Sequence, residues 1–135
     1  MKKLFAVVLV AVLAAFVVGC SSESGTADVS SDEVAYTVRA NKMTAEFKAN
    51  EVKADEKYKG KVVIVNGKVT DMGKDITDEP YIIVGGTGML DGVQCMFAGS
   101  GVDAISKLSK GDSVSVKGKY DGFLMYPLLA NSSLQ

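Results

Sequence analysis

The sequence of 135 residues contains no histidine, no tryptophan, two prolines and only two cysteines. Without histidine there is no Ser-His-Asp or Cys-His catalytic group and no zinc site ligated by histidine, and two cysteines are too few for a thiolate cluster. No pair of residues has the type and spacing needed for proton transfer or nucleophilic attack. We therefore predict one small domain with no catalytic residues, no metal site and no cofactor.

An excess of charge of one sign is also missing. The chain has 15 basic and 16 acidic residues, and loss of a leader that contains Lys2 and Lys3 would leave 13 basic residues against the same 16 acids. Proteins that bind nucleic acids usually carry a basic excess. The charge balance therefore disfavours nucleic acid as the partner.

The first 19 residues have the pattern of an export signal. Met1-Lys2-Lys3 provides a positive start, and residues 4–18 form an uninterrupted apolar run that ends at Gly19-Cys20. A membrane-spanning helix needs about 20 apolar residues, so this run is short for an anchor. We predict that residues 1–19 are a signal peptide.

The end of this run, Val17-Val18-Gly19-Cys20, resembles the lipobox of bacterial lipoproteins. The resemblance implies cleavage between Gly19 and Cys20, a lipid on the Cys20 thiol, and attachment to a membrane of the cell envelope, because two or three acyl chains anchor a protein stably. Ser21 stands where an Asp would resemble an inner-membrane retention signal, so the outer membrane is favoured if the host has two membranes. An ordinary secretory signal with a chance cysteine is the alternative.

The composition then divides the exported part in two. Residues 20–36 are rich in Ser, Gly and acidic residues and poor in apolar ones, which predicts a lipidated, disordered tether. Residues 37–135 are the predicted folded domain, with a helical segment at its start.

In this helical segment, apolar residues are four apart. Met43 and Phe47, and then Ala54 and Tyr58, have charged residues between them, as on the buried face of a helix. Asn50 interrupts the pattern, so two short helices and one bent helix both fit it.

Beyond Gly60 the apolar pattern has the two-residue period of strands. The predicted strands are residues 62–69, 80–84, 92–97, 114–118 and 125–130, with a short helix at 102–110 and a turn at Asp121-Gly122 before the last strand. Gly67 and Gly118 lie inside strands, where glycine permits the coiling of a small barrel. The order predicts a mainly β fold, a five-stranded OB-fold barrel preceded by the helical segment. A small open sheet with flanking helices is the alternative.

These segments also resemble the tRNA-anti-like OB-fold family of small bacterial envelope lipoproteins. The resemblance covers about residues 41–132, and specific pieces of it are Tyr58-Lys59-Gly60-Lys61, Gly92-Val93-Gln94-Cys95 and Lys110-Gly111-Asp112. It implies the fold and no particular activity, since one fold serves many functions. Relatives often have a second cysteine near the last strands. Here Cys95 has no such partner, and its place on an apolar strand face predicts a buried, unreactive thiol.

Two polar segments invite comparison with ligand-binding loops. The acids of residues 71–79 lack the alternating order and central glycine of a calcium-binding loop. The glycines of residues 85–88 lack the Gly-Lys-Ser/Thr that completes a phosphate-binding loop. We interpret the first segment as a solvated turn and the second as a flexible hairpin loop.

Most OB folds bind ligands on the outer face of their second and third strands and on the neighbouring loops. Here this surface corresponds to residues 81–84, 87–90 and 94–96, which are mildly polar and fit a protein or glycan partner. Barrel lysines and tyrosines could instead hold a single-stranded nucleic acid. The candidate binding residues are Lys68, Tyr81, Ile83, Gln94, Met96, Lys117 and Tyr120.

We therefore predict a lipid-anchored, exported, non-enzymatic OB-fold module that binds a protein or glycan of the bacterial cell envelope. Binding of single-stranded nucleic acid is the alternative from another functional class. A third hypothesis is an envelope protein of a mobile element that blocks a surface receptor or channel.

Overall fold

The computed structural model describes residue 29 and residues 32–86, 91–99 and 101–135. The predicted signal peptide, Cys20, most of the predicted tether and the surface segment 87–90 lie outside the described residues. Within the described part, no helix is long and apolar enough to cross a membrane.

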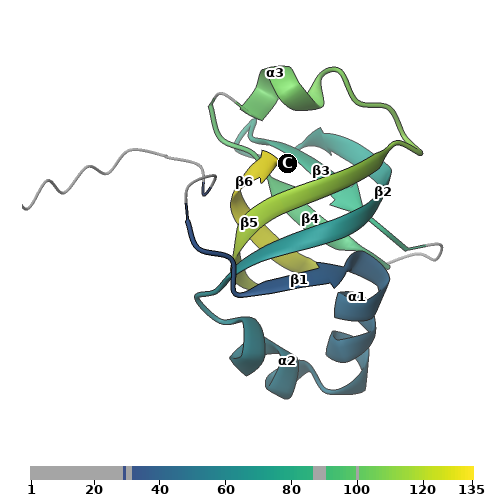
Figure 1. Cartoon of the computed structure of the whole chain (residues 1–135). Coiled ribbons are helices and arrows are strands. Elements are labelled where there is room, and N and C mark those ends of the chain that lie inside the picture. Colours follow the sequence, from purple (N-terminus) through teal and green to yellow (C-terminus); the bar gives the residue numbers. More distant parts are fainter. Residues whose placement is uncertain (1–28, 30–31, 87–90, 100) are drawn as a thin grey trace, which may run out of the picture.

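The described chain forms six strands and three short helices. In chain order they are β1 (Tyr36–Arg39), α1 (Ala40–Ala49), α2 (Glu51–Tyr58), β2 (Val62–Lys74), β3 (Pro80–Val84), β4 (Val93–Met96), α3 (Gly101–Ile105), β5 (Ser113–Phe123) and β6 (Pro127–Leu134). The sheet order is β1-β2-β3-β4-β6-β5, and an added β2–β5 pairing closes the five strands β2 to β6 into a barrel (Figure 1). The predicted OB-fold barrel is confirmed, and the open-sheet alternative is wrong.

The long strand β2 closes the barrel because it changes partner along its length. Its residues 62–68 pair with β5, and the part from Val69 onward pairs with β3. A Cβ on Gly67 would lie 3.0 Å from the Val84 side chain and 3.4 Å from that of Ala40. The glycine predicted to serve the barrel thus lets β3 and α1 approach where β2 changes partner.

The helical segment is two helices rather than one bent helix. Asn50 separates them with an extended backbone (φ −161°, ψ 96°), and its side chain caps α2 by accepting a hydrogen bond from the Lys53 amide. The predicted apolar face is buried against the barrel, as Met43, Phe47, Ala54 and Tyr58 are each at most 4% exposed.

Aromatic rings fill the end of the barrel that α1 and α2 cover, opposite the end where α3 lies (Figure 1). The Phe47 ring stacks on those of Tyr58 and Phe123, at centroid distances of 6.0 and 5.1 Å. The Tyr58 hydroxyl donates a hydrogen bond to Glu46, which also pairs with Lys57 at 2.9 Å. Burial and the hydrogen bond to Glu46 raise the pKa of Tyr58 to about 12.

Several element boundaries differ from the prediction. Strand β1, which the sequence analysis missed, runs parallel to β2. Strand β2 continues to Lys74, so the solvated turn is shorter than residues 71–79, and α3 is shorter than residues 102–110. The predicted turn at Asp121-Gly122 is wrong, because β5 continues through an irregularity with Gly122 at φ +119° and the chain turns at residues 124–126.

Three described residues of the predicted tether contact the barrel, because the Ala35 amide donates a hydrogen bond of 2.8 Å to the Val62 carbonyl and Tyr36 is the first residue of β1. The Val29 side chain is 4% exposed, and its amide donates a hydrogen bond of 3.1 Å to the carbonyl of Asn131 on β6.

Candidate functional site

A groove lies over the outer face of β4 and β6, between the β2–β3 turn and the β5–β6 turn. It has a volume of about 370 Å³. The second and third barrel strands, β3 and β4, and these two turns form the surface on which OB folds bind oligonucleotides and oligosaccharides. We refer to it as the acidic groove, and its described lining residues are Asp75, Glu79, Gln94, Met96, Phe97, Ala98, Asp121, Leu124, Tyr126, Leu128, Ala130 and Asn131.

Strand alternation decides which side chains face this surface. Ile82 and Cys95 are fully buried in the barrel, so their neighbours point outward. Gln94 lies opposite Ile83 on β3 and opposite Leu128 on β6, which places residues from three strands on one outer face.

The β2–β3 turn holds the Asp75 carboxylate in place. The Asp75 carboxylate accepts hydrogen bonds from the Thr77 amide and hydroxyl at 2.8 and 2.7 Å and from the Glu79 amide at 3.0 Å. The Thr77 hydroxyl and these amides hold the pKa of Asp75 below its usual value. Asp75 is therefore an ionised residue that organises a turn and has no properties of a general acid.

The acids of the predicted segment 71–79 do not come together as a cluster. Asp71 lies on β2 and pairs with Lys110 at 3.1 Å, and this contact lowers the pKa of Asp71. Among the described residues, no group of three or more cysteine or carboxylate side chains is arranged to hold a metal ion.

The acidic groove combines negative charge with apolar surface. Asp75, Glu79 and Asp121 line it, and the described lining includes no lysine or arginine. The turns beside it carry large apolar side chains in solvent, since Ile76 is fully exposed and Leu124 is 82% exposed. Exposed apolar residues beside a charged groove are typical of an interaction surface.

The structure divides the seven predicted binding residues into separate groups. Gln94 and Met96 line the acidic groove, and Tyr81 and Ile83 belong to the same outer face of the β3–β4 hairpin. Ile83 and Met96 are only 7% and 9% exposed, so on this face Gln94 and Tyr81 offer more surface to a partner. Lys68 lies on β2 and lines a different cavity.

The remaining two are buried on β5. Lys117 is 6% exposed and Tyr120 is 3% exposed. The Tyr120 ring packs against Phe47, with 5.7 Å between the centroids, so it offers no face to a base. The predicted lysine and tyrosine set therefore does not form one continuous platform.

The β5–β6 side of the acidic groove includes Asp121, Leu124 and Asn131, which the sequence did not indicate as binding residues. With the turn predicted at Asp121-Gly122, Leu124 had no place beside the ligand face. A turn at this place was indicated by Pro127, because a proline favours an extended or turn conformation in the preceding residue. The three residues before it, Leu124 to Tyr126, all have large side chains.

Comparisons with known proteins agree with the fold. The comparison with curated proteins finds no match. Among solved structures, the chain is similar to a crystal structure named "putative nucleic acid-binding lipoprotein" from Klebsiella pneumoniae subsp. pneumoniae, with 21% identity and a TM-score of 0.62. The match covers 73% of this chain and 90% of that chain, and at this identity it shows a shared fold. The tRNA_anti-like family model matches residues 1–134, and the chain therefore belongs to the tRNA_anti-like family.

Proposed function

We propose that the protein is a lipid-anchored, exported OB-fold module that binds another protein of the bacterial cell envelope through the acidic groove. The observation that carries the proposal is the chemistry of this groove, which has three carboxylates and no lysine or arginine in its described lining. The lipobox-like Val17-Val18-Gly19-Cys20 supports the anchor, with the lipid on Cys20 and the exported face of the outer membrane as its place in a host with two membranes. The proposed role involves no catalysis.

Charge complementarity defines the partner. Asp75, Glu79 and Asp121 favour a segment with lysine or arginine side chains, and such complementary charges speed association and reject partners of the wrong sign. The phosphates of a nucleic acid would be repelled at the same place, because binding to them depends on basic side chains.

Apolar residues on the two turns favour a protein over a glycan. Leu124 is 82% exposed, Met125 is 64% exposed, and Ile76 stands on the opposite turn. Side chains of this size contribute to binding when a partner removes them from water. The partner segment we infer therefore combines basic residues with apolar ones.

Binding of single-stranded nucleic acid is the alternative function. The name of the Klebsiella pneumoniae structure favours it for a protein with this fold. The chemistry of the acidic groove and the burial of Lys117 and Tyr120 oppose it here. A titration with a single-stranded oligonucleotide tests this alternative. Amide NMR shifts at Lys117 and Tyr120, together with an affinity that falls steeply as the salt concentration rises, would favour it.

Site-specific photo-crosslinking in cells tests the protein partner. A photoreactive phenylalanine analogue replaces Leu124 beside the acidic groove in one variant and Val52 on α2 in the other. Both positions carry large apolar side chains that are at least 72% exposed, so neither change disturbs the core. We expect a discrete protein adduct from position 124 and none from position 52.

A change of charge in the acidic groove then tests whether the partner contacts the groove itself. Adding Asp121→Lys to the Leu124 variant should abolish the adduct, whereas adding Asp103→Lys on α3 should leave it unchanged. An adduct that survives Asp121→Lys, an equal yield from position 52, or an adduct that nuclease removes would overturn the proposal.

The anchor has its own test. We expect the Cys20→Ala variant to lose its lipid-dependent mobility shift and to leave the membrane fraction. If this variant remains lipid-modified and membrane-bound, Cys20 is not the lipidation site.

A further inference from the structure

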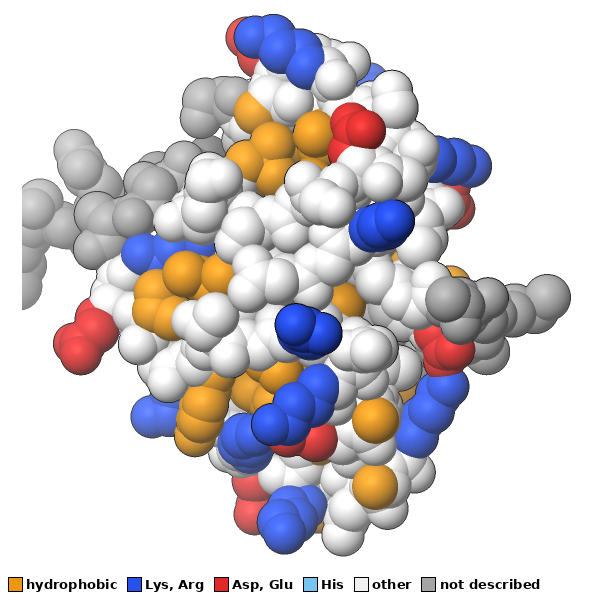
Figure 2. Space-filling view, turned by 45° about the vertical axis from the view of Figure 1, so that its right-hand side comes forward, with side chains coloured by type: hydrophobic (Ala, Val, Ile, Leu, Met, Phe, Trp, Pro, Cys, Tyr) orange, Lys and Arg blue, Asp and Glu red, His pale blue; other side chains and the backbone are white. Residues whose placement is uncertain are grey.

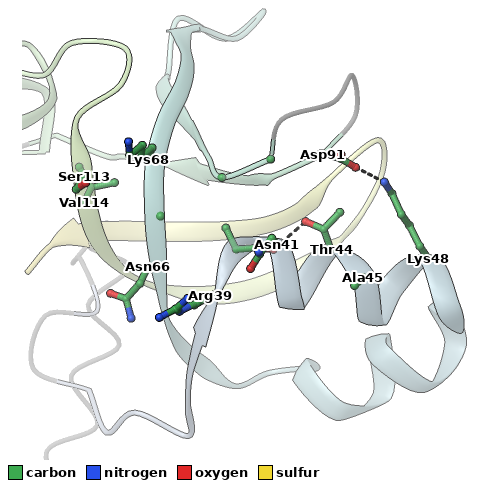
Figure 3. Close-up of a pocket in the computed structure, with 14 residues that line it drawn as sticks. Arg39, Asn41, Thr44, Ala45, Lys48, Asn66, Lys68, Asp91, Ser113 and Val114 are labelled. Carbon is green, nitrogen blue, oxygen red and sulfur yellow. Dashed lines mark hydrogen bonds and ion pairs between the residues drawn. The ribbon is translucent and has the colours of Figure 1, made fainter.

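A second and larger cavity lies on another side of the barrel, between the start of α1, the middle of β2 and the start of β5 (Figure 3). Its volume is about 690 Å³, within the range of small-molecule sites. Small residues, among them Ala40, Gly67 and Gly85, line it beside the polar ones and leave room for a ligand. We refer to this cavity as the basic pocket.

Strand pairing brings polar side chains together at the basic pocket. Arg39 on β1 lies opposite Asn66 on β2, and Lys68 lies opposite Ser113 on β5. Asn66 and Lys68 are two residues apart on β2 and therefore share its outer face. Asn41, in the first turn of α1, adds a second amide (Figure 3).

Two of the cations lack protein partners. Among the described residues, the side chains of Arg39 and Lys68 make no ion pair and no hydrogen bond, and both residues are exposed. The acid in the described lining is Asp91, which forms an ion pair with Lys48 (Figure 3). The described lining therefore has a net positive charge that no carboxylate neutralises.

The net charge of this lining is opposite in sign to that of the acidic groove. Figure 2 shows basic side chains over this face, and acidic side chains lie among them where α1 and α2 are, because these helices carry four lysines and four carboxylates. The positive potential at the basic pocket therefore comes from Arg39 and Lys68 themselves. The partial positive charge at the start of α1 adds to this potential, although the site does not depend on it.

We propose that the basic pocket binds the phosphate group of a small organic phosphate or of a lipid headgroup. A guanidinium such as that of Arg39 donates two parallel hydrogen bonds to a phosphate, and the Lys68 ammonium adds a point charge. The amides of Asn41 and Asn66 and the Ser113 hydroxyl supply neutral donors for the remaining oxygens. A phosphate ester matches both the charge and the donors of this pocket.

The test is a titration of the full-length protein, isotopically labelled and held in a sugar-based detergent, with sn-glycerol 3-phosphate. Amide NMR shifts should concentrate at Arg39, Asn66, Lys68 and Ser113. We expect Arg39→Gln and Lys68→Gln each to weaken binding roughly tenfold, because a hydrogen bond between charged groups is lost. Lys53→Gln, on an exposed face of α2, is the matched control and should leave the affinity unchanged.

A second arm distinguishes the two sources of phosphate. The protein is placed in lipid nanodiscs of phosphatidylcholine with or without phosphatidylglycerol. Shifts at the same amides that require phosphatidylglycerol identify a headgroup, whereas shifts that appear only with glycerol phosphate identify a soluble ligand. Absence of these shifts in both arms, or an equal loss of affinity in Lys53→Gln, would overturn the proposal.

Discussion

The hydroxyl of Tyr120 on β5 donates a hydrogen bond of 2.7 Å to the carboxylate of Asp55 on α2. The bond joins the barrel to a helix 65 positions earlier in the chain, and the Tyr120 side chain is almost fully buried there. Tyr120 is therefore part of the contact between α2 and the barrel rather than a surface for stacking bases.

Removing this hydroxyl should weaken the contact. We expect Tyr120→Phe to lower the free energy of unfolding by about 1–2 kcal/mol, because the bond involves a carboxylate that water can partly resolvate. Urea unfolding measures the change. Tyr126→Phe is the control, since no hydrogen bond joins the Tyr126 hydroxyl to any described residue, and an equal loss in this control would contradict the assignment.

Stability should fall at high pH because of Tyr58. Burial and the hydrogen bond to Glu46 raise the pKa of Tyr58 to about 12, whereas an unfolded tyrosine ionises at about 10. Between these two pKa values, the folded state keeps the proton of the Tyr58 hydroxyl while the unfolded state loses it. The stabilisation is therefore complete below about pH 10 and is lost as the pH rises to about 12.

We expect this change to reduce the free energy of unfolding by roughly 2–3 kcal/mol, since each pKa unit corresponds to about 1.4 kcal/mol. Urea unfolding at a series of pH values measures the slope. Tyr58→Phe should show a shallower slope over this range than the unchanged protein. Identical slopes would mean that another group causes the alkaline loss.

Gly118 allows a close approach of β5 and β6. A Cβ at this position would lie 2.7 Å from the Ser132 hydroxyl and 2.8 Å from the Leu129 Cβ, closer than such atoms pack. We expect Gly118→Ala to destabilise the protein by about 1–3 kcal/mol through overpacking. Thermal and urea unfolding measure the effect.

Gly73→Ala is the matched control for Gly118→Ala. Gly73 is also a glycine within a strand, but there a Cβ would meet the Tyr81 hydroxyl at 3.1 Å, at the far end of a side chain that can shift. We expect a smaller loss than at Gly118. A larger loss at Gly73 would show that the close approach of β6 is not the main constraint.

Cys95 should react with thiol reagents only when the fold opens. Its side chain is fully buried, and burial raises the pKa of the thiol above its ordinary value. The reagent therefore cannot reach the sulfur in the folded protein, and little of the reactive thiolate is present. We expect labelling by a thiol reagent to be slow in buffer and fast in urea, with the rate following the population of opened molecules. Rapid labelling of the native protein would contradict the burial of Cys95.

Particular residues show why the strands could be predicted. Val63, Val65 and Val69 stand at alternate positions and are buried in the barrel, whereas Ile64, Asn66 and Lys68 lie on the opposite, more exposed face. A strand places successive side chains on opposite faces, so one buried face leaves a two-residue period that local sequence reports directly. The break at Asn50 is local too, because an N-cap residue satisfies amides within its own helix.

The missed elements depend on contacts from elsewhere in the chain. Tyr36–Arg39 forms a strand by lying parallel to β2, and four residues carry too short a pattern to reveal a partner 27 positions away. The continuation of β5 past Asp121-Gly122 depends likewise on pairing with β6. In both β2 and β5, pairing with a distant strand therefore continues the strand through a segment whose local sequence predicts a turn.

The sequence by itself determined the family and the barrel, and it predicts an export signal, because apolar runs and alternation are properties of neighbouring residues. Only the tertiary structure decided which polar residues share a surface. It brings Asp121 to the groove of Asp75 and Glu79, and it places Arg39 beside Asn66 in a separate basic pocket. It also buries Lys117 and Tyr120, because the exposure of a side chain is set by the elements that pack over it, and these lie far away in sequence.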